Sequence, residues 1–205
     1  MRPSITNLSR RRVAATILLA FALATPLLAA TKTEDQLIAE LGASDPDKVT
    51  SALQELEEKY PTSTKALATI KKLLTDQRMR VKRKAARVIG AVHAEVNEDD
   101  IRAICALLKP PRMEERPDSV LKGPPVEAML DGLKALRGLK APSAIPEVTP
   151  LLRYSNNHVV RDACRTLAVI GNKDVIPAIE PLLEDSNREV RKDAKEAIAA
   201  LRSKS

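Results

Sequence analysis

Apolar residues recur at helical spacing along this chain, in the same pattern several times. Four Leu-Leu pairs each follow aliphatic residues that lie three and six positions before the first leucine of the pair. The four sets are Leu67, Ile70, Leu73 and Leu74; Ile101, Ile104, Leu107 and Leu108; Ile145, Val148, Leu151 and Leu152; and Ile176, Ile179, Leu182 and Leu183. This spacing places each set on one face of an α-helix, so it predicts four amphipathic helices.

A second pattern, with apolar residues at relative positions 0, 4, 8 and 11, follows each of these segments. Its sets are Val81, Ala85, Ile89 and Val92; Ala128, Gly132, Leu136 and Leu139; Val159, Ala163, Leu167 and Ile170; and Val190, Ala194, Ile198 and Leu201. The second place always holds Ala or Gly. We therefore expect neighbouring helices to approach each other most closely at that place.

Together the two patterns predict helix pairs over residues 64–92, 98–139, 142–170 and 173–202. A weaker fifth pair precedes them: "TEDQ" at 33–36 is typical of a capping box, and Ala52 and Leu56 keep two places of the second pattern. Residues 151–163, "LLRYSNNHVVRDA", return 31 positions later as "LLEDSNREVRKDA". Such a period is typical of stacked repeats, so we expect an all-α fold, an α-solenoid of about five helix pairs.

The final unit departs from the pattern at one position. Lys195 stands where the other units have Ala86, Leu133 and Cys164. A terminal repeat has one face toward solvent, so we expect the side chain of Lys195 to lie on that face.

Three segments carry a family resemblance. "DSNREVRKDAKEAIAAL", "TDQRMRVKRKAARVIGAV" and "GNKDVIPAIEPLLED" resemble HEAT repeats of the short type also found in phycobilisome lyases. The resemblance covers most of residues 33–203 and implies the solenoid fold. It also implies bonds between neighbouring units from a turn Asp to a basic helix residue. Asp76 and Asp185 match the Asp, and Lys82 and Arg191 stand at the basic place, although Tyr154 replaces the Asp of the fourth unit.

The N-terminus has the pattern of a bacterial-type secretory signal peptide, residues 1–30. Four arginines precede an uncharged apolar run over 13–30 that ends in small residues. We expect cleavage after Ala30, with Ala24 as a second site and an uncleaved membrane anchor as the alternative. The working domain is then 31–205, periplasmic or secreted, with no membrane span after cleavage. "SRRRVAA" resembles a twin-arginine signal, but general secretion fits better because Phe-Leu does not follow.

Removal of this segment changes the charge and the composition. The whole chain has 34 Lys and Arg, of which 4 lie in residues 1–30, and 27 Asp and Glu that all lie beyond, which leaves 30 − 27 = +3. Tyr60 and Tyr154 remain as the aromatic residues. The core must therefore consist of aliphatic side chains, and the high pI of the whole chain overstates the basicity of the mature domain.

No residue pattern predicts catalysis, a metal site or a cofactor. His93 and His158 lack metal-ligand spacing, so we expect surface histidines. Cys105 and Cys164 fall on helices that are diagonal in the predicted stack, beyond the roughly 7 Å Cα separation that a disulfide bridges. We expect free cysteines, with a disulfide as the alternative. The lyase activity of the resembling family is not expected, because it requires a cytoplasmic pigment-bearing partner.

The strongest charge feature is a basic stripe on one predicted helix. At 100° per residue, Arg80, Arg83 and Arg87 form a line opposite the buried face, with Lys84 beside it. These four residues are the candidate partner-binding site, for an acidic protein segment or an anionic envelope polymer. The alternative is a solvated helix face with its own counterions. Nucleic acid is not expected, because no aromatic residue accompanies the basic run.

A proline-rich insertion over residues 109–125 interrupts the repeat, and Pro150 and Pro181 should bend the helices that contain them. The insertion is either a mobile loop or a loop that clasps a partner. The sequence thus predicts an exported HEAT-repeat scaffold that mediates protein–protein interaction in the cell envelope without catalysis; its oligomeric state stays open. The alternative is an envelope enzyme or accessory subunit with a site at the basic stripe and the 109–125 loop.

Overall fold

The computed structural model describes residues 32–92, 95–109 and 126–204. The predicted signal peptide, His93 and nearly all of the proline-rich insertion lie outside the described residues. The chain divides into two compact units, Met1–Thr33 and Glu34–Ser205. The fold described below is that of the second unit alone.

The second unit consists of helix pairs, with no strand among its described residues. The first helices of the pairs are α2 (Glu34–Glu40), α4 (Thr64–Lys72), α6 (Glu98–Cys105), α8 (Ile145–Val148) and α10 (Ile176–Ile179). The second helices are α3 (Pro46–Lys59), α5 (Met79–Ala91), α7 (Val126–Leu139), α9 (Asn157–Ile170) and α11 (Arg188–Arg202). The four pairs predicted from the sequence, and the weaker fifth before them, are thereby confirmed.

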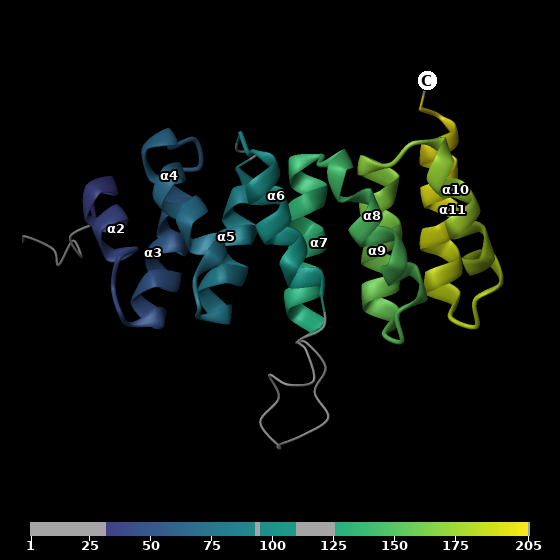
Figure 1. Cartoon of the computed structure of the whole chain (residues 1–205), viewed down its shortest axis with the longest axis horizontal. Coiled ribbons are helices and arrows are strands. Elements are labelled where there is room, and N and C mark those ends of the chain that lie inside the picture. Colours follow the sequence, from purple (N-terminus) through teal and green to yellow (C-terminus); the bar gives the residue numbers. More distant parts are fainter. Residues whose placement is uncertain (1–31, 93–94, 110–125, 205) are drawn as a thin grey trace, which may run out of the picture. The chain divides into compact units, whose positions relative to one another are not determined.

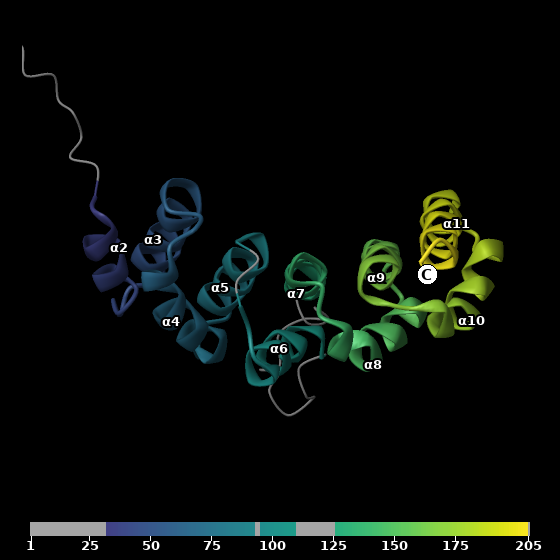
Figure 2. The same cartoon turned by 90° about the horizontal axis from the view of Figure 1, so that it is seen from above.

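The pairs stack in order, so that the second helices form one row and the first helices another (Figures 1 and 2). Each second helix contacts the next: α3 packs on α5, α5 on α7, α7 on α9, and α9 on α11. Within residues 34–205, the second helices lie on the inner side of the curve seen in Figure 2. The basic stripe lies on α5, one of these second helices.

Asparagine and aspartate side chains start several helices. Asn97 and Asp100 form a reciprocal capping box at α6. In the repeated segments 151–163 and 182–194, an asparagine caps each second helix. Asn156 Oδ1 accepts a hydrogen bond from the backbone N–H of His158 at the start of α9, and Asn187 Oδ1 accepts one from Glu189 at the start of α11. A capping side chain satisfies a backbone donor that has no partner within the helix, so "SN" recurs where a second helix must begin.

The core contains nearly all members of the two apolar patterns. Leu183, in the last described unit, departs from the pattern and is 36% exposed. Lys195 is exposed, whereas its counterparts Ala86, Leu133 and Cys164 are fully buried. The predicted terminal face is therefore confirmed.

The first helices of the later units end in 3₁₀ turns, and proline accounts for only part of this. Pro150 and Pro181 lie in five-residue 3₁₀ segments, and the α-helical parts before them are only four residues long. Shorter 3₁₀ segments also follow α4 and α6, where no proline is present. Proline thus extends a 3₁₀ ending that the repeat already has.

The tightest approach at a described glycine lies near the ends of α5 and α7, which corrects the expectation from the second pattern for this pair of helices. A Cβ on Gly138 would lie 2.2 Å from the carbonyl oxygen of Gly90, and a Cβ on Gly90 would lie 2.5 Å from Cα of Ala135. Gly132, at the second place, instead faces Leu107 and Leu108 of its own unit at 3.1–3.2 Å. Two backbones meet at Gly90 and Gly138, a contact that only glycine permits.

Candidate partner-binding surface

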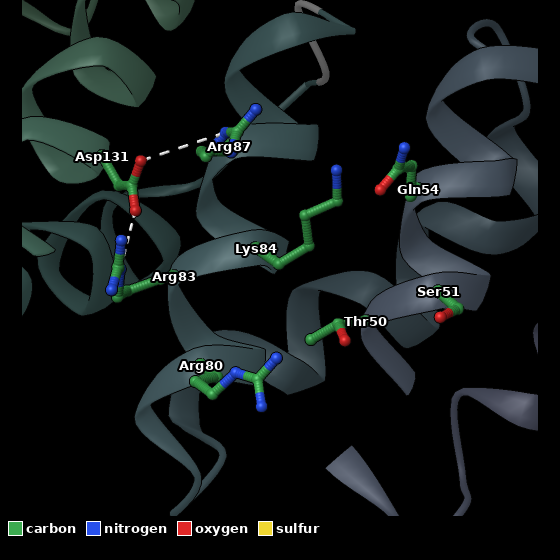
Figure 3. A pocket seen from close by; sticks show the side chains of 8 residues that line it. All are labelled: Thr50, Ser51, Gln54, Arg80, Arg83, Lys84, Arg87 and Asp131. Atoms are coloured by element: carbon green, nitrogen blue, oxygen red, sulfur yellow. Dashed lines mark hydrogen bonds and ion pairs between the residues drawn. The ribbon is translucent and has the colours of Figure 1, made fainter. Parts of the chain in front are cut away.

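The basic stripe lies on one face of α5, as the helical periodicity predicts. Val81, Ala85 and Ile89 are buried on the opposite face. Arg80, Arg83, Lys84 and Arg87 line a pocket of about 310 Å³ with Thr50, Ser51 and Gln54 of α3 and Asp131 of α7 (Figure 3). The structure thus brings the four predicted residues together, beside three neutral polar side chains and one carboxylate.

Each cation of the stripe has a carboxylate neighbour from another repeat. Arg83 Nε donates to Asp131 Oδ2 at 2.7 Å across to α7, and its Nη1 lies 3.4 Å from Glu127. On the other side, Lys84 Nζ donates to Glu57 Oε2 of α3 at 2.8 Å. These bonds connect α5 to both adjacent second helices, so part of the stripe joins repeats to one another.

The outer members of the stripe are held less firmly. Arg80 Nη1 lies 2.8 Å from Asp47, but both side chains are about 70% exposed. Arg87 is 42% exposed, and its nearest recorded carboxylate is Asp131 at 3.9 Å, which is already bonded to Arg83 (Figure 3). Exposed pairs of this kind contribute little to stability, so Arg80 and Arg87 can exchange their partners at small cost.

The bond from Arg83 to the next unit has a counterpart further along the stack. Arg161 of α9 donates through Nε to Asp193 Oδ2 of α11 at 2.7 Å, and its Nη2 lies 3.3 Å from Glu189. Arg83 and Arg161 share one repeat position, two residues after the first member of the second pattern. Asp131 and Asp193 share the next position, three residues after the first member in their own units. Sequence reasoning missed these carboxylates, although their recurrence at one repeat position was a usable signal.

A second pocket, of about 230 Å³, adjoins the stripe at the ends of α5 and α7. It is lined by Arg87, Lys134 and Arg137, with Glu57 and the small residues Gly90, Ala91 and Gly138. Arg137 Nη1 is buried without a hydrogen-bond partner and lies 3.6 Å from Asp162 of α9. Lys134 is exposed and has no recorded ion pair within the described part of the chain. Sequence reasoning did not single out either residue.

The turn aspartate of the second unit pairs differently from the way the family resemblance implies. Asp76 accepts bonds from the backbone N–H and guanidinium of Arg78, and the bond from this side chain lowers the pKa of the Asp76 carboxyl below its usual value. Arg78 Nη1 also donates to the carbonyls of Ala43 and Ser44 in the preceding unit. The link between units therefore runs through Arg78 and not Lys82. Arg191 likewise donates to the Asp185 carbonyl of its own unit.

The described residues contain no group of three or more His, Cys, Asp or Glu side chains that could hold a metal ion. Cys105 and Cys164 are free and buried on α6 and α9, and burial raises the pKa of their thiols to about 11 and about 12. Both thiols therefore stay protonated and unreactive at neutral pH. His158 is exposed at the start of α9.

No helix of the described residues is long and apolar enough to cross a bilayer.

Comparisons with known proteins agree with this architecture. The family model of HEAT repeats matches residues 118–199. No curated protein matches the sequence. A structure of the complex of CpcE and CpcF of phycocyanin lyase from Nostoc sp. PCC7120 aligns with a TM-score of 0.65 at 22% identity, covering 84% of this chain. It covers 66% of the lyase chain, so the present chain spans slightly less than two thirds of that relative.

Engineered solenoids align at similar sequence identity but with lower TM-scores. Computationally designed armadillo repeat proteins for modular peptide recognition align with a TM-score of 0.55 at 21% identity, over 82% of each chain. A designed armadillo repeat protein in complex with the peptide (KR)4 aligns with a TM-score of 0.58 at 19% identity, over 91% of this chain and 84% of that one. At these identities the likeness establishes the fold alone. With its recurring helix pairs, the chain is an α-solenoid, and its residues 118–199 match the HEAT-repeat family.

Proposed function

We propose that the chain is an exported, non-catalytic scaffold that binds a protein partner in the cell envelope, with an acidic segment of that partner lying across α3, α5 and α7. One observation carries this proposal: four basic side chains of α5 and three neutral polar side chains of α3 line the same pocket on the row of second helices. Cations can bind carboxylates there, while Thr50, Ser51 and Gln54 can bond with a peptide backbone.

The similar engineered proteins support this mode of binding. A designed armadillo repeat protein of comparable fold is in complex with (KR)4, a basic peptide. The present chain carries basic residues on its own row of second helices, so complementarity of charge favours an acidic peptide. Rigid helices also position the side chains without a cost of ordering on the scaffold side.

A protein segment fits this surface better than a uniform polyanion. The carboxylates of Asp47, Glu57, Glu127 and Asp131 alternate with the four cations of the stripe. A polymer with a charge on every unit would meet these carboxylates as well as the cations. A peptide can place neutral residues opposite them, so an acidic protein is the partner we propose.

Partner capture tests the binding function. The exported chain, isolated with cross-linked material from envelope extract, should enrich a discrete protein that is released as the salt concentration rises, because salt screens exposed charges. Replacing the two exposed arginines, Arg80→Gln with Arg87→Gln, should reduce recovery of that protein. The matched control replaces Arg153 and Arg188, which are exposed basic residues away from the pocket. Enrichment of only a low-molecular-weight ligand would overturn the proposal.

Export is the part of the proposal that rests on residues 1–30 alone. Fractionation of a producing bacterium should place the protein in the periplasm or medium, and mass spectrometry should find a mature N-terminus at Thr31. A start at residue 25 would indicate the second cleavage site. A full-length protein in the membrane fraction would indicate an uncleaved anchor, and recovery from the cytoplasm would refute export.

The alternative, an accessory subunit of an envelope enzyme, draws on one comparison. The phycocyanin lyase relative is a complex of two chains, and this chain spans 66% of the one it matches. In that case capture should recover an enzyme whose activity rises when this chain is added. A captured protein whose activity is unchanged would leave the scaffold function standing.

A further inference from the structure

A row of cations runs along the stack at one position of the second pattern, six residues after its first member. Counting from Val81, Ala128 and Val159, that position holds Arg87 (81 + 6), Lys134 (128 + 6) and Arg165 (159 + 6). These residues lie on α5, α7 and α9, which pack on one another in sequence. The position becomes Glu196 in the last unit and Gln54 in α3, so the row belongs to the three central units.

The row is more accessible than Arg83 and Lys84 of the stripe. Arg87 and Arg165 are 42% and 46% exposed, and Lys134 is also exposed. Arg83 and Lys84, in contrast, are 25% and 14% exposed and hold carboxylates of adjacent repeats at 2.7–2.8 Å. An incoming carboxylate would have to break those bonds at Arg83 and Lys84. In the row, Lys134 has no ion pair among the described residues and Arg87 lies 3.9 Å from its nearest carboxylate, while Arg165 is exposed but bonds to Asp193 at 3.0 Å.

Hydrogen-bonding capacity along the row is only partly used. Lys134 has no recorded ion pair within the described residues, and Arg87 is 3.9 Å from a carboxylate that Arg83 already holds. Arg165 shares Asp193 with Arg161. Beside the row, Arg137 has a buried Nη1 without a hydrogen-bond partner. The row therefore has unused donors from α5 to α9.

Helix dipoles do not cancel this attraction. Each row residue lies four or five positions before the last residue of its helix, at Ala91, Leu139 and Ile170. The negative end of a helix dipole acts on an anion only within the last turn, and its effect is weaker than that of a hydrogen bond to a charged group. Bonds to the cations exceed the dipole term.

We infer that this row, Arg87, Lys134 and Arg165, is the anchor for the acidic segment and binds one carboxylate per repeat. The inference rests on the proposed function and refines it. Packed helices lie about 8–10 Å apart. A polyproline II segment has three residues per turn and rises about 3.1 Å per residue, so acidic residues at every third position lie about 9 Å apart on one side. The partner segment should therefore carry Asp or Glu at every third position.

Two labelled peptides of equal composition test the spacing. The first is fluorescein-labelled (Glu-Pro-Ala)4, and the second joins four consecutive glutamates to (Pro-Ala)4. Fluorescence anisotropy with the purified chain at low salt should give at least fivefold tighter binding for the spaced peptide. Equal or tighter binding of the clustered peptide would overturn the one-carboxylate-per-repeat arrangement. Tighter binding of a sulfated polysaccharide fragment would favour a polymer ligand instead.

Variants test the residues. Lys134→Gln alone breaks no recorded ion pair of the described residues and should weaken binding of the spaced peptide about threefold or more. The triple change Arg87→Gln, Lys134→Gln and Arg165→Gln should weaken it at least tenfold. The matched control neutralises three exposed basic residues off the row, Arg153, Arg188 and Lys195, and should change binding less than twofold. Circular dichroism verifies that each variant remains folded.

The outcomes separate this inference from the proposed function. Equal losses in the two triple variants would mean nonspecific charge attraction and would refute the row. Loss on Arg83→Gln with Lys84→Gln, without loss in the row variants, would also refute it but would keep an acidic partner at the stripe. If neither peptide binds the wild-type chain, the row is refuted, while recovery of a discrete protein in the capture experiment would still support the scaffold function.

Discussion

The contact between Gly90 and Gly138 gives a sharp test of how the repeats pack. Replacing Gly138 with Ala adds one methyl group that would lie 2.2 Å from the Gly90 oxygen and 2.9 Å from its carbonyl carbon. Ordinary contacts of a Cβ begin near 3.4 Å. Because the obstacle is backbone and cannot rotate away, α5 and α7 must separate locally by about 1 Å.

The cost can be estimated from two opposing effects. Overpacking of a close contact destabilises a protein by about 1–3 kcal/mol, and a rigid backbone obstacle places this case at the upper end. Replacing a helical glycine with alanine otherwise gains about 0.5–1 kcal/mol through the unfolded state. The net effect should be about 2 kcal/mol of destabilisation, which lowers the melting temperature of a chain of this size by about 4–8 °C.

Thermal unfolding followed by circular dichroism at 222 nm measures this shift. Gly42→Ala is the matched control, because its Cβ would meet only the Ala39 oxygen at 3.5 Å, and it should melt at or slightly above the wild-type temperature. Gly90→Ala should resemble Gly138→Ala, and the double variant should lose less than the sum, since both changes separate the same helices. A Gly138→Ala protein as stable as wild type would refute the close approach.

Three further predictions concern the core, the turns and the buried thiols. Ala163→Leu, at a fully buried site, should cost about 1–3 kcal/mol, whereas Lys195→Leu on the exposed terminal face should be nearly neutral; equal melting temperatures would contradict the assignment of these faces. Arg78→Ala should lower the urea midpoint more than Lys82→Ala, because Arg78 bonds to carbonyls of the preceding unit, and the reverse order would contradict that link. The raised pKa of Cys164, about 12 against 9.0, keeps the folded thiol neutral while the unfolded thiol ionises. The contribution of the buried thiol to stability is therefore complete below about pH 9 and is lost toward pH 12 by about 1.4 kcal/mol per pH unit. Cys164→Ala should flatten the pH dependence of the free energy of unfolding in this range. An unchanged slope would be evidence against the raised pKa.

Local periodicity was sufficient to predict the repeat. An α-helix turns every 3.6 residues, so a helix that buries one face must show that spacing in its own sequence. The predicted pair 142–170 begins with a 3₁₀ turn at Pro142 and ends with α9 at Ile170. The terminal face at Lys195 and the common face of Arg80, Arg83, Lys84 and Arg87 followed from the same spacing.

The bonding partners of the basic stripe depended on tertiary structure. Arg83 pairs with Asp131, 48 positions away, and Lys84 pairs with Glu57, 27 positions away. The stripe by itself left both a binding face and a solvated face open. Which cations of the stripe form ion pairs with adjacent helices depends on how far each helix is rotated toward its neighbour.

The sequence by itself determined the helix pairs, their order, the faces they bury and the exposed position of Lys195 in the last helix. The packed structure decided that backbones touch at Gly90 and Gly138, that Arg78 links the first units, and that the cations of the row are exposed. Periodicity fixes which side of a helix is apolar because that is a property of consecutive residues. Contacts between repeats depend on helix rotation and separation, which the packing of all side chains sets together.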